Sequence, residues 1–215
     1  MRTLYLFLFL FLSFGAISQS NSLGDFTHAA DIGKPKKAGS SSYDQASKTY
    51  TVKGAGYNIW FNRDEFQYLY NKISGDFILT GNFEFITDTG NAHRKFGWMI
   101  RESEDAGAVH ITAAQHADGL VALQWRPQQG VNMRDPEDEI FFPTKKIYKT
   151  VQLERKGNMI TMRIGNPGEP LQLVGSHEMK LPESVLAGIY VCSHNEDNID
   201  EVKVTDVKIE KPKKK

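Results

Sequence analysis

The sequence has a single cysteine, Cys192, and therefore cannot form a disulfide within the chain. It has no excess of charge of either sign, since 26 lysines and arginines balance 26 aspartates and glutamates. A near-neutral surface offers no long-range attraction to nucleic acid or to anionic lipid, so neither is expected as a partner. The stability of the fold must come from its hydrophobic core.

Long apolar runs are also rare, and the clearest one stands at the start of the chain. Arg2 precedes an apolar run from Leu4 to Phe14, and the small residues Ala16 and Ser18 follow it. This arrangement is typical of a secretory signal peptide, and the run is short for a membrane span, although an uncleaved anchor is the alternative. We expect cleavage after Ser18, no membrane span in the mature form, and export to the periplasm or the cell exterior. The absence of any Asn-x-Ser/Thr acceptor favours a bacterial source.

The rest of the chain divides into three parts by composition. Residues 19–42 lack periodicity and include a stretch of small and charged residues, so we expect a leader and a loop there. Residues 43–210 are long enough for one domain with its own core. Residues 211–215 form a short basic tail that we interpret as a disordered, solubilising end. We expect the protein to be a monomer.

Hydrophobic residues recur with a period of two. Between Phe77 and Ile86 the residue types alternate in a way that a strand explains and a helix does not. Turn signals such as Lys156-Gly157-Asn158, which predicts a hairpin, separate the runs. The other runs with strand character are 49–53, 57–61, 96–102, 108–114, 120–126, 150–156, 159–164, 187–193 and 202–209, whereas 64–71 fits a helical turn, a strand or a loop. The pattern predicts an all-β fold, an antiparallel two-sheet β-sandwich of the jelly-roll type.

Three consecutive runs, 96–102, 108–114 and 120–126, assign their side chains to two faces. The set predicted to lie in the core between the sheets is Phe96, Trp98, Ile100, Val109, Ile111, Val121, Leu123 and Trp125. The opposite set is Met99, Arg101, His110, Thr112, Gln124 and Arg126. If the three strands are neighbours, this second set shares one surface, which we expect to be a polar trough open to water and a floor for a polar ligand.

Five segments carry a resemblance to a known module. They are 54–60 (GAGYNIW), 74–77 (SGDF), 97–103 (GWMIRES), 153–158 (LERKGN) and 191–195 (VCSHN). In this order and spacing they resemble the concanavalin A-like lectin/glucanase module of exported bacterial proteins, which is often attached to Tol-type "biopolymer transporter" β-propeller repeats. The resemblance runs from about Asp31 to Ile209 and implies a jelly roll with a concave, sugar-binding or accessory face, without catalytic residues to carry over. The chain departs from related modules at 165–170, where many have Asp-Gly followed by tryptophan.

Residues suited to binding a sugar fall on the predicted trough and beside it. Sugars are held by flat apolar rings that stack on the pyranose and by planar polar groups that bind hydroxyls. Trp60 and Arg63 provide both kinds within one short stretch, which also holds Tyr57 and Asp64. The predicted ligand-binding residues are Trp60, Arg63, Arg101, His110, Gln124 and Arg126. The alternative is that the aromatic residues pack and that Arg63 and Asp64 form a surface pair.

Other chemistries have weaker sequence support. Glycoside hydrolysis needs two carboxyl groups roughly 5 to 9 Å apart, and the nearest candidates, Glu137 to Glu139, lie in a proline-containing charged stretch that predicts a solvated loop. The histidines lack metal-ligand spacing, so no metal site and no cofactor are predicted. Structural calcium is an open alternative, with Asp88, Asp135, Asp138 and Asp197 as potential donors. Cys192 is interpreted as a packed thiol rather than a reactive one.

We therefore expect an exported, non-catalytic carbohydrate-binding or accessory module whose partner is a carbohydrate or a polymer-derived ligand. A polysaccharide hydrolase or lyase on the same fold is the first alternative, and two acidic side chains converging in the groove would favour it. A structural or protein-interaction module is the second alternative, which a concave face filled by its own loops would favour.

Overall fold

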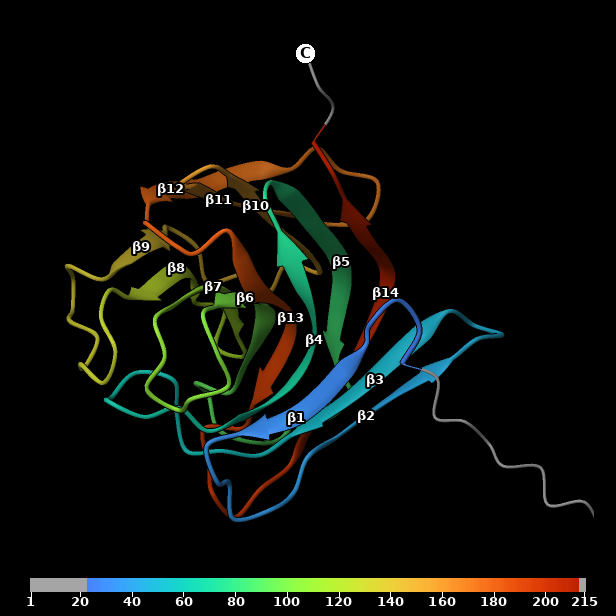
Figure 1. Cartoon of the computed structure of the whole chain (residues 1–215). Coiled ribbons are helices and arrows are strands. Elements are labelled where there is room, and N and C mark those ends of the chain that lie inside the picture. Colours follow the sequence, from blue (N-terminus) through green and yellow to red (C-terminus); the bar gives the residue numbers. More distant parts are fainter. Residues whose placement is uncertain (1–22, 213–215) are drawn as a thin grey trace, which may run out of the picture.

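The computed structural model describes residues 23–212, which form two facing antiparallel sheets of seven strands each (Figure 1). Sheet A contains, in spatial order, β1 (His28–Ile32), β4 (Phe66–Ser74), β13 (Ser184–Cys192), β6 (Lys95–Arg101), β7 (His110–His116), β8 (Val121–Arg126) and β9 (Glu139–Phe142). Sheet B contains β12 (Gln172–Glu178), β11 (Met159–Gly165), β10 (Thr150–Lys156), β5 (Phe77–Phe85), β14 (Asp200–Glu210), β3 (Thr49–Gly54) and β2 (Ser40–Asp44). The predicted signal peptide and the last residues of the basic tail lie outside the described residues.

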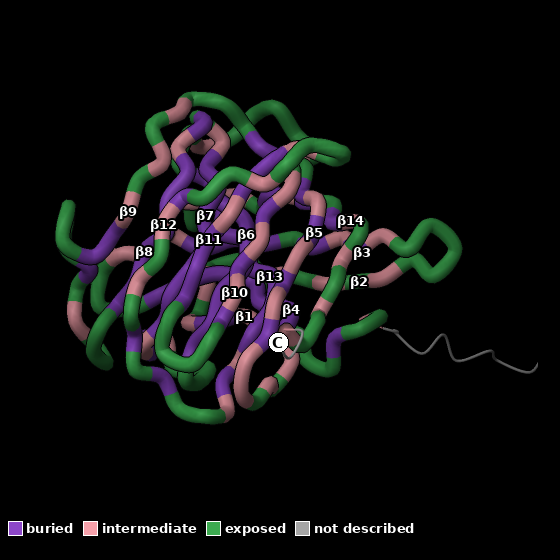
Figure 2. Tube along the Cα trace, turned by 90° about the horizontal axis from the view of Figure 1, so that it is seen from above, coloured by how far each residue is buried: buried purple, intermediate pink, exposed green. Residues whose placement is uncertain are grey.

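The predicted fold class is confirmed: within residues 23–212 the chain is all-β, with no helix, and its two sheets pack as a sandwich. No helix in this range is long and apolar enough to cross a membrane. The core lies between the sheets, where alternate residues of the central strands meet (Figure 2). Trp98 is fully buried there, and its indole N–H donates a hydrogen bond of 2.9 Å to the Val151 carbonyl of sheet B. Seven of the eight predicted core residues from 96–125 belong to this cluster, and the eighth, Val109, is partly buried and packs against it.

Most predicted strands are present, and the hairpin at Lys156-Gly157-Asn158 joins β10 to β11. The sequence analysis did not predict four strands, and all four lie at the edges of the sheets: β1, β2, β9 and β12. Edge strands are short and half exposed, so they lack the hydrophobic alternation that marks a central strand. Two of them, β1 and β2, begin in the stretch 19–42 that the sequence assigns to a leader and a loop, which therefore contributes to both sheets.

One predicted strand is wrong. Residues 57–61 belong to a loop whose isolated bridge joins Ile59 to Asp64, while the ambiguous stretch that follows forms β4. Gly56 enters the loop at a φ of 112°, a conformation that glycine adopts freely. A hydrogen bond from Glu65 N to Asn58 O (3.0 Å) closes the loop on itself, and one from Met133 N to Trp60 O (2.8 Å) joins it to the loop before β9. Arg126 of β8 ties it to sheet A through a 2.5 Å bond to Phe61 O. This loop positions the candidate site.

Candidate functional site

The outer face of sheet A, the face turned away from the core, carries along its middle a second apolar cluster that includes Met99, Ala114, Tyr190 and Cys192. Gly97, Ala114 and Ala122 lie side by side on β6, β7 and β8, on the same face as Arg101 and Gln124. All three are buried, and Ala114 packs within the apolar cluster. Gly97 also permits close approach of β6 and β7, because a Cβ at this position would lie 1.8 Å from the Ala113 carbonyl oxygen.

One end of this face is closed by a buried charge cluster. Arg126 donates hydrogen bonds to both oxygens of Asp64, at 2.5 and 2.7 Å, and Arg101 Nη1 lies 3.4 Å from Oδ2 of the same carboxylate. His110 Nδ1 lies 3.5 Å from that oxygen. All four side chains are 0% exposed. We call Asp64, Arg101, His110 and Arg126 the closed end.

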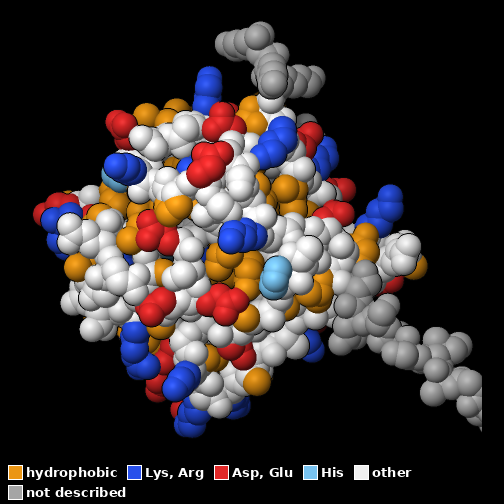
Figure 3. All heavy atoms as spheres, in the orientation of Figure 1, with side chains coloured by type: hydrophobic (Ala, Val, Ile, Leu, Met, Phe, Trp, Pro, Cys, Tyr) orange, Lys and Arg blue, Asp and Glu red, His pale blue; other side chains and the backbone are white. Residues whose placement is uncertain are grey.

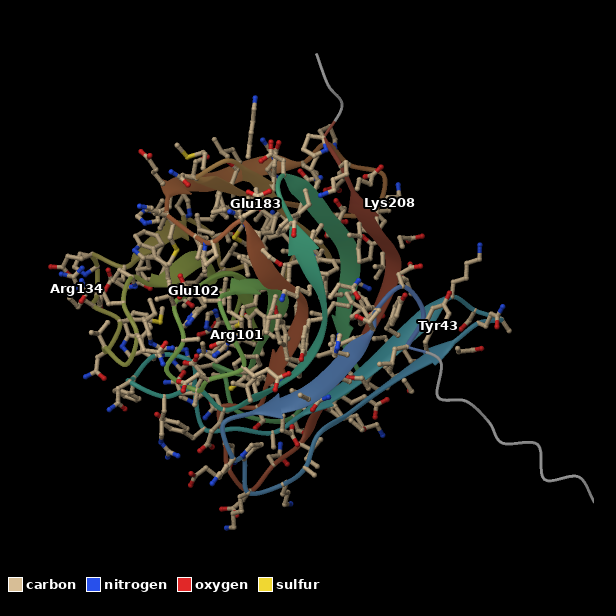
Figure 4. The ribbon with its side chains drawn as sticks, viewed as in Figure 1. Tyr43, Arg101, Glu102, Arg134, Glu183 and Lys208 are labelled. Carbon is tan, nitrogen blue, oxygen red and sulfur yellow. The ribbon has the colours of Figure 1, made fainter. Side chains whose placement is uncertain are left out.

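Loops cover the closed end and accept further hydrogen bonds from its two arginines. Arg126 donates to the carbonyls of Phe61 and Val131, at 2.5 and 3.0 Å, and Arg101 donates to the carbonyl of Ser103 at 2.6 Å. Figure 4 shows Arg101 inside the body of the molecule, in contrast to Arg134 at its periphery. The guanidinium groups therefore tie three loops onto the sheet.

The open polar trough expected from the sequence is thus not present at this end. The register does bring Arg101, His110 and Arg126 together on neighbouring strands. The arginine donors, however, bond to Asp64 and to loop carbonyls, and none of the three side chains has an exposed surface. His110 Nε2 is buried without a hydrogen-bond partner among residues 23–212. Parity determines which face a residue occupies, but it carries no information about the loops that cover that face. The ligand-binding role expected for these three residues stays a prediction.

The other end of the same face holds a pocket of about 220 Å³. We call it the sheet A pocket, and it is lined by Asn58, Trp60, His93, Lys95, His116, Leu120, Gln124, Asp135, Glu139, Phe141 and His194. Its volume is below the roughly 300 to 1,000 Å³ typical of pockets for drug-sized ligands, and it suits one sugar ring better than several. Of the six predicted ligand-binding residues, Trp60 and Gln124 line it.

One wall of the pocket carries nitrogen groups. Lys95 is 4% exposed, and its Nζ donates a 2.9 Å hydrogen bond to Asn58 Oδ1. Beside it on β7, His116 is 2% exposed, and burial followed by the charge of Lys95 holds its pKa well below the usual range. The same two causes lower the pKa of His194. These two imidazoles are therefore neutral at neutral pH and can donate or accept hydrogen bonds.

The opposite wall carries carboxyl groups. Gln124 Nε2 donates a 3.0 Å hydrogen bond to Glu139 Oε2. Burial raises the pKa of Glu139, the Gln124 hydrogen bond opposes this rise, and the neighbouring Asp135 adds to it. The expectation of a solvated loop for 137–139 is wrong for two residues: Glu139 begins β9 and is 8% exposed, and Asp138 is buried and paired with Arg134 at 2.8 Å.

Arg63 lies outside both the pocket and the closed end. Its guanidinium stacks 4.6 Å above the Tyr57 ring, and its Nη1 donates a 2.7 Å hydrogen bond to Glu65. The predicted surface pair with Asp64 does not form, since Asp64 belongs to the closed end.

The sequence prediction missed most of the pocket, although a signal for two residues was present. Lys95 has the parity of Met99 and Arg101, and His116 has the parity of His110 and Thr112, so both lie on the outer face. Lys95 lies one residue before the predicted strand 96–102, and His116 lies two residues after the predicted strand 108–114. Extending those strands identifies both. Asn58, His194 and Asp135 come from loops, whose folding over the sheet no periodicity reports.

A larger pocket of about 520 Å³ lies on the outer face of sheet B. It is lined mainly by hydroxyl, amide and charged groups from β2, β3, β5 and β14. Several of these groups pair with one another, as in Lys149 with Glu84 and Asn82 with Asp206, each at 2.7 Å. Its one aromatic residue, Phe83, is 1% exposed and offers no ring face. We therefore regard the sheet A pocket as the better ligand site.

No protein-family model and no curated protein matches the sequence. Solved structures do resemble the fold. A functionally unknown protein from Saccharomyces cerevisiae has a TM-score of 0.60 at 13% identity, over 86% of this chain and 97% of that one. Lectin I-B4 from Griffonia simplicifolia has a TM-score of 0.52 at 12% identity, over 93% and 97%.

The family 7 alginate lyase A1-II′ has a TM-score of 0.52 at 9% identity, over 80% of this chain and 83% of that one. At these identities the similarity shows the fold, which is the jelly-roll sandwich of the concanavalin-like lectins and of these lyases. The attachment to Tol-type repeats stays a prediction.

Among residues 23–212, no group of three or more histidine, cysteine or acidic side chains is placed to hold a metal ion. Two of the potential calcium donors have cationic partners instead, Asp138 with Arg134 and Asp197 with Lys36. Calcium binding therefore stays a prediction without a defined site.

Proposed function

We propose that this protein is an exported, non-catalytic carbohydrate-binding module that holds one sugar ring of a glycan in the sheet A pocket. The observation that carries the proposal is the composition of the pocket. Trp60 and Phe141 provide apolar rings, and Asn58, Gln124 and the imidazoles provide donors and acceptors around them. This combination suits a pyranose, which has apolar C–H faces and a polar edge. Lectins among the structural neighbours support the same ligand class.

A glycan array followed by calorimetric titration of the best ligand tests the proposal. Trp60→Ala removes the half-buried ring and is expected to weaken binding about tenfold or more, the equivalent of about 1.4 kcal/mol. Phe61→Ala is the matched control, because Phe61 is an exposed neighbouring aromatic that stacks on Tyr57 and does not line the pocket. The absence of binding to any glycan, or unchanged affinity in Trp60→Ala, would refute this function.

A polysaccharide-active enzyme is the second candidate, and one observation favours it. Two acidic side chains, Asp135 and Glu139, converge in the pocket, and alginate lyases share the fold. Asp135 raises the pKa of Glu139, so the two carboxyls act on each other directly, whereas the carboxyls of glycoside hydrolases stand roughly 5 to 9 Å apart on either side of the scissile bond. Incubation of the bound glycan with the protein decides between them: chain shortening that disappears in Glu139→Gln would establish an enzyme.

A structural or protein-interaction role is the third candidate. The closed end, where loops cover the buried charged side chains on the outer face of sheet A, is the feature that favours it. Complete absence of glycan binding in a folded protein would support this role.

A further inference from the structure

Lys95 differs from the other buried cations among residues 23–212. Arg101 and Arg126 face Asp64, and Arg94 Nε lies 3.4 Å from Asp200. Arg155 donates to several backbone carbonyls. Lys95 is 4% exposed, yet its Nζ has one hydrogen-bond acceptor, the amide oxygen of Asn58, and no carboxylate within 4.0 Å.

An ammonium group has three N–H donors and is costly to bury without an anion. The Asn58 oxygen cannot compensate fully, because it also accepts a 2.8 Å hydrogen bond from Ile59 N. Burial lowers the pKa of Lys95, and the negative groups that oppose this shift act from a distance. A ligand anion that reached Nζ would supply the missing acceptors and the missing charge together.

Among residues 23–212, the carboxylates whose charges reach Lys95, those of Asp64, Glu139 and Asp118, all lie more than 4.0 Å from its Nζ. Its neighbours across the strands are Cys192 on β13 and His116 on β7, and both are uncharged at neutral pH. The pocket carboxyls belong to the far side: Glu139 is on β9, with β7 and β8 between it and β6, and it is bonded to Gln124. Figure 3 shows acidic and basic side chains interspersed over one face of the molecule, without a large patch of either sign. Selection of an anion would therefore be local to Lys95.

From this geometry we propose that the sheet A pocket selects an acidic sugar, whose carboxylate or sulfate group binds Lys95 Nζ between Asn58 and His116. The inference rests on the proposed function and specifies its ligand class. The apolar rings of Trp60 and Phe141 contact the sugar ring, while the nitrogen wall binds the anionic substituent.

The test compares matched ligands on the full mature protein. The probes are a uronic acid oligosaccharide, the same oligosaccharide with its carboxyls reduced to alcohols, and a sulfated oligosaccharide. We expect the wild type to bind at least one acidic probe about tenfold or more tightly than the reduced one. Lys95→Met should abolish that preference and keep the affinity for the reduced probe within about twofold. Lys203→Met on β14, an exposed lysine of sheet B, is the matched control and should change nothing.

The outcomes are distinguishable. Equal binding of acidic and reduced probes by the wild type, or a preference that survives in Lys95→Met, would overturn the inference and leave the proposed function standing. Binding of no probe and no array glycan would overturn both. Lys95→Met removes a buried, unpaired charge, so it should fold with an unfolding midpoint no lower than that of the wild type. If it does not fold, the comparison of acidic and reduced probes on the wild type still decides the inference.

Discussion

The closed end gives the most quantitative prediction about this protein. Among residues 23–212, Asp64 is the one carboxylate paired with Arg101 and Arg126, and all three side chains are fully buried. Asp64→Asn preserves the shape of the side chain but removes its charge. The two guanidinium groups would then remain buried without a counter-ion.

Removing one partner of a buried ion pair costs about 3 to 5 kcal/mol, because the remaining charge stays desolvated. Asp64 serves two arginines and makes a close two-pronged contact with Arg126, so we expect a loss at the upper end of that range. The triple variant Asp64→Leu, Arg101→Met and Arg126→Met removes all three charges. It should recover most of the stability, since well-packed apolar residues replace buried ion pairs at little cost.

Urea unfolding followed by tryptophan fluorescence measures both variants by linear extrapolation. A loss below about 1 kcal/mol in Asp64→Asn would show that water reaches the arginines and that the loops do not close this end. A triple variant less stable than Asp64→Asn would show that the arginines stabilise the loops even without their partner Asp64. Either result would refute the account of the closed end.

Two further predictions concern buried titratable groups. Burial lowers the pKa of His110 to about 3 and that of His116 well below its usual range. Both are neutral in the folded protein, whereas in the unfolded chain each takes up a proton below about pH 6.5. Each histidine therefore contributes stability that is present above pH 6.5 and lost as the pH falls. The loss in the free energy of unfolding is about 2 kcal/mol per histidine between pH 7 and pH 5. His110→Gln should flatten the dependence of unfolding free energy on pH by this amount, and an unchanged slope would contradict it. Burial raises the pKa of Cys192 to about 11, so the thiol should resist thiol reagents at pH 8 until the protein is unfolded; rapid labelling of the native protein would contradict a packed thiol.

Alternation in the sequence was sufficient to predict the sandwich and the two faces of its middle strands. Trp98 and Arg101 lie on opposite faces because strand geometry leaves no other arrangement. Edge strands such as β9 were missed because one of their sides meets solvent, which weakens the alternation.

The site was less predictable than the fold. Trp60 and Gln124, two of the predicted ligand-binding residues, line the sheet A pocket, and their binding role stays a prediction. The burial of Arg101 and Arg126 depends on contacts with Ser103 and Phe61, respectively, which lie in loops. Loop positions over a sheet arise from tertiary packing, and no local pattern encodes them. The alternation could have predicted Lys95, since this residue continues the outward-facing positions of β6.

The central proposal is that a glycan binds in the sheet A pocket and that Trp60 is the one tryptophan it contacts. The three tryptophans test it directly: Trp60 lines the pocket, Trp98 is fully buried in the core, and Trp125 is 6% exposed and stacks on His177. A ¹H–¹⁵N titration with the ligand found on the array should shift the Trp60 indole signal, assigned with Trp60→Phe, and leave the other two in place. An unmoved Trp60 signal in a protein that binds the glycan would contradict the account.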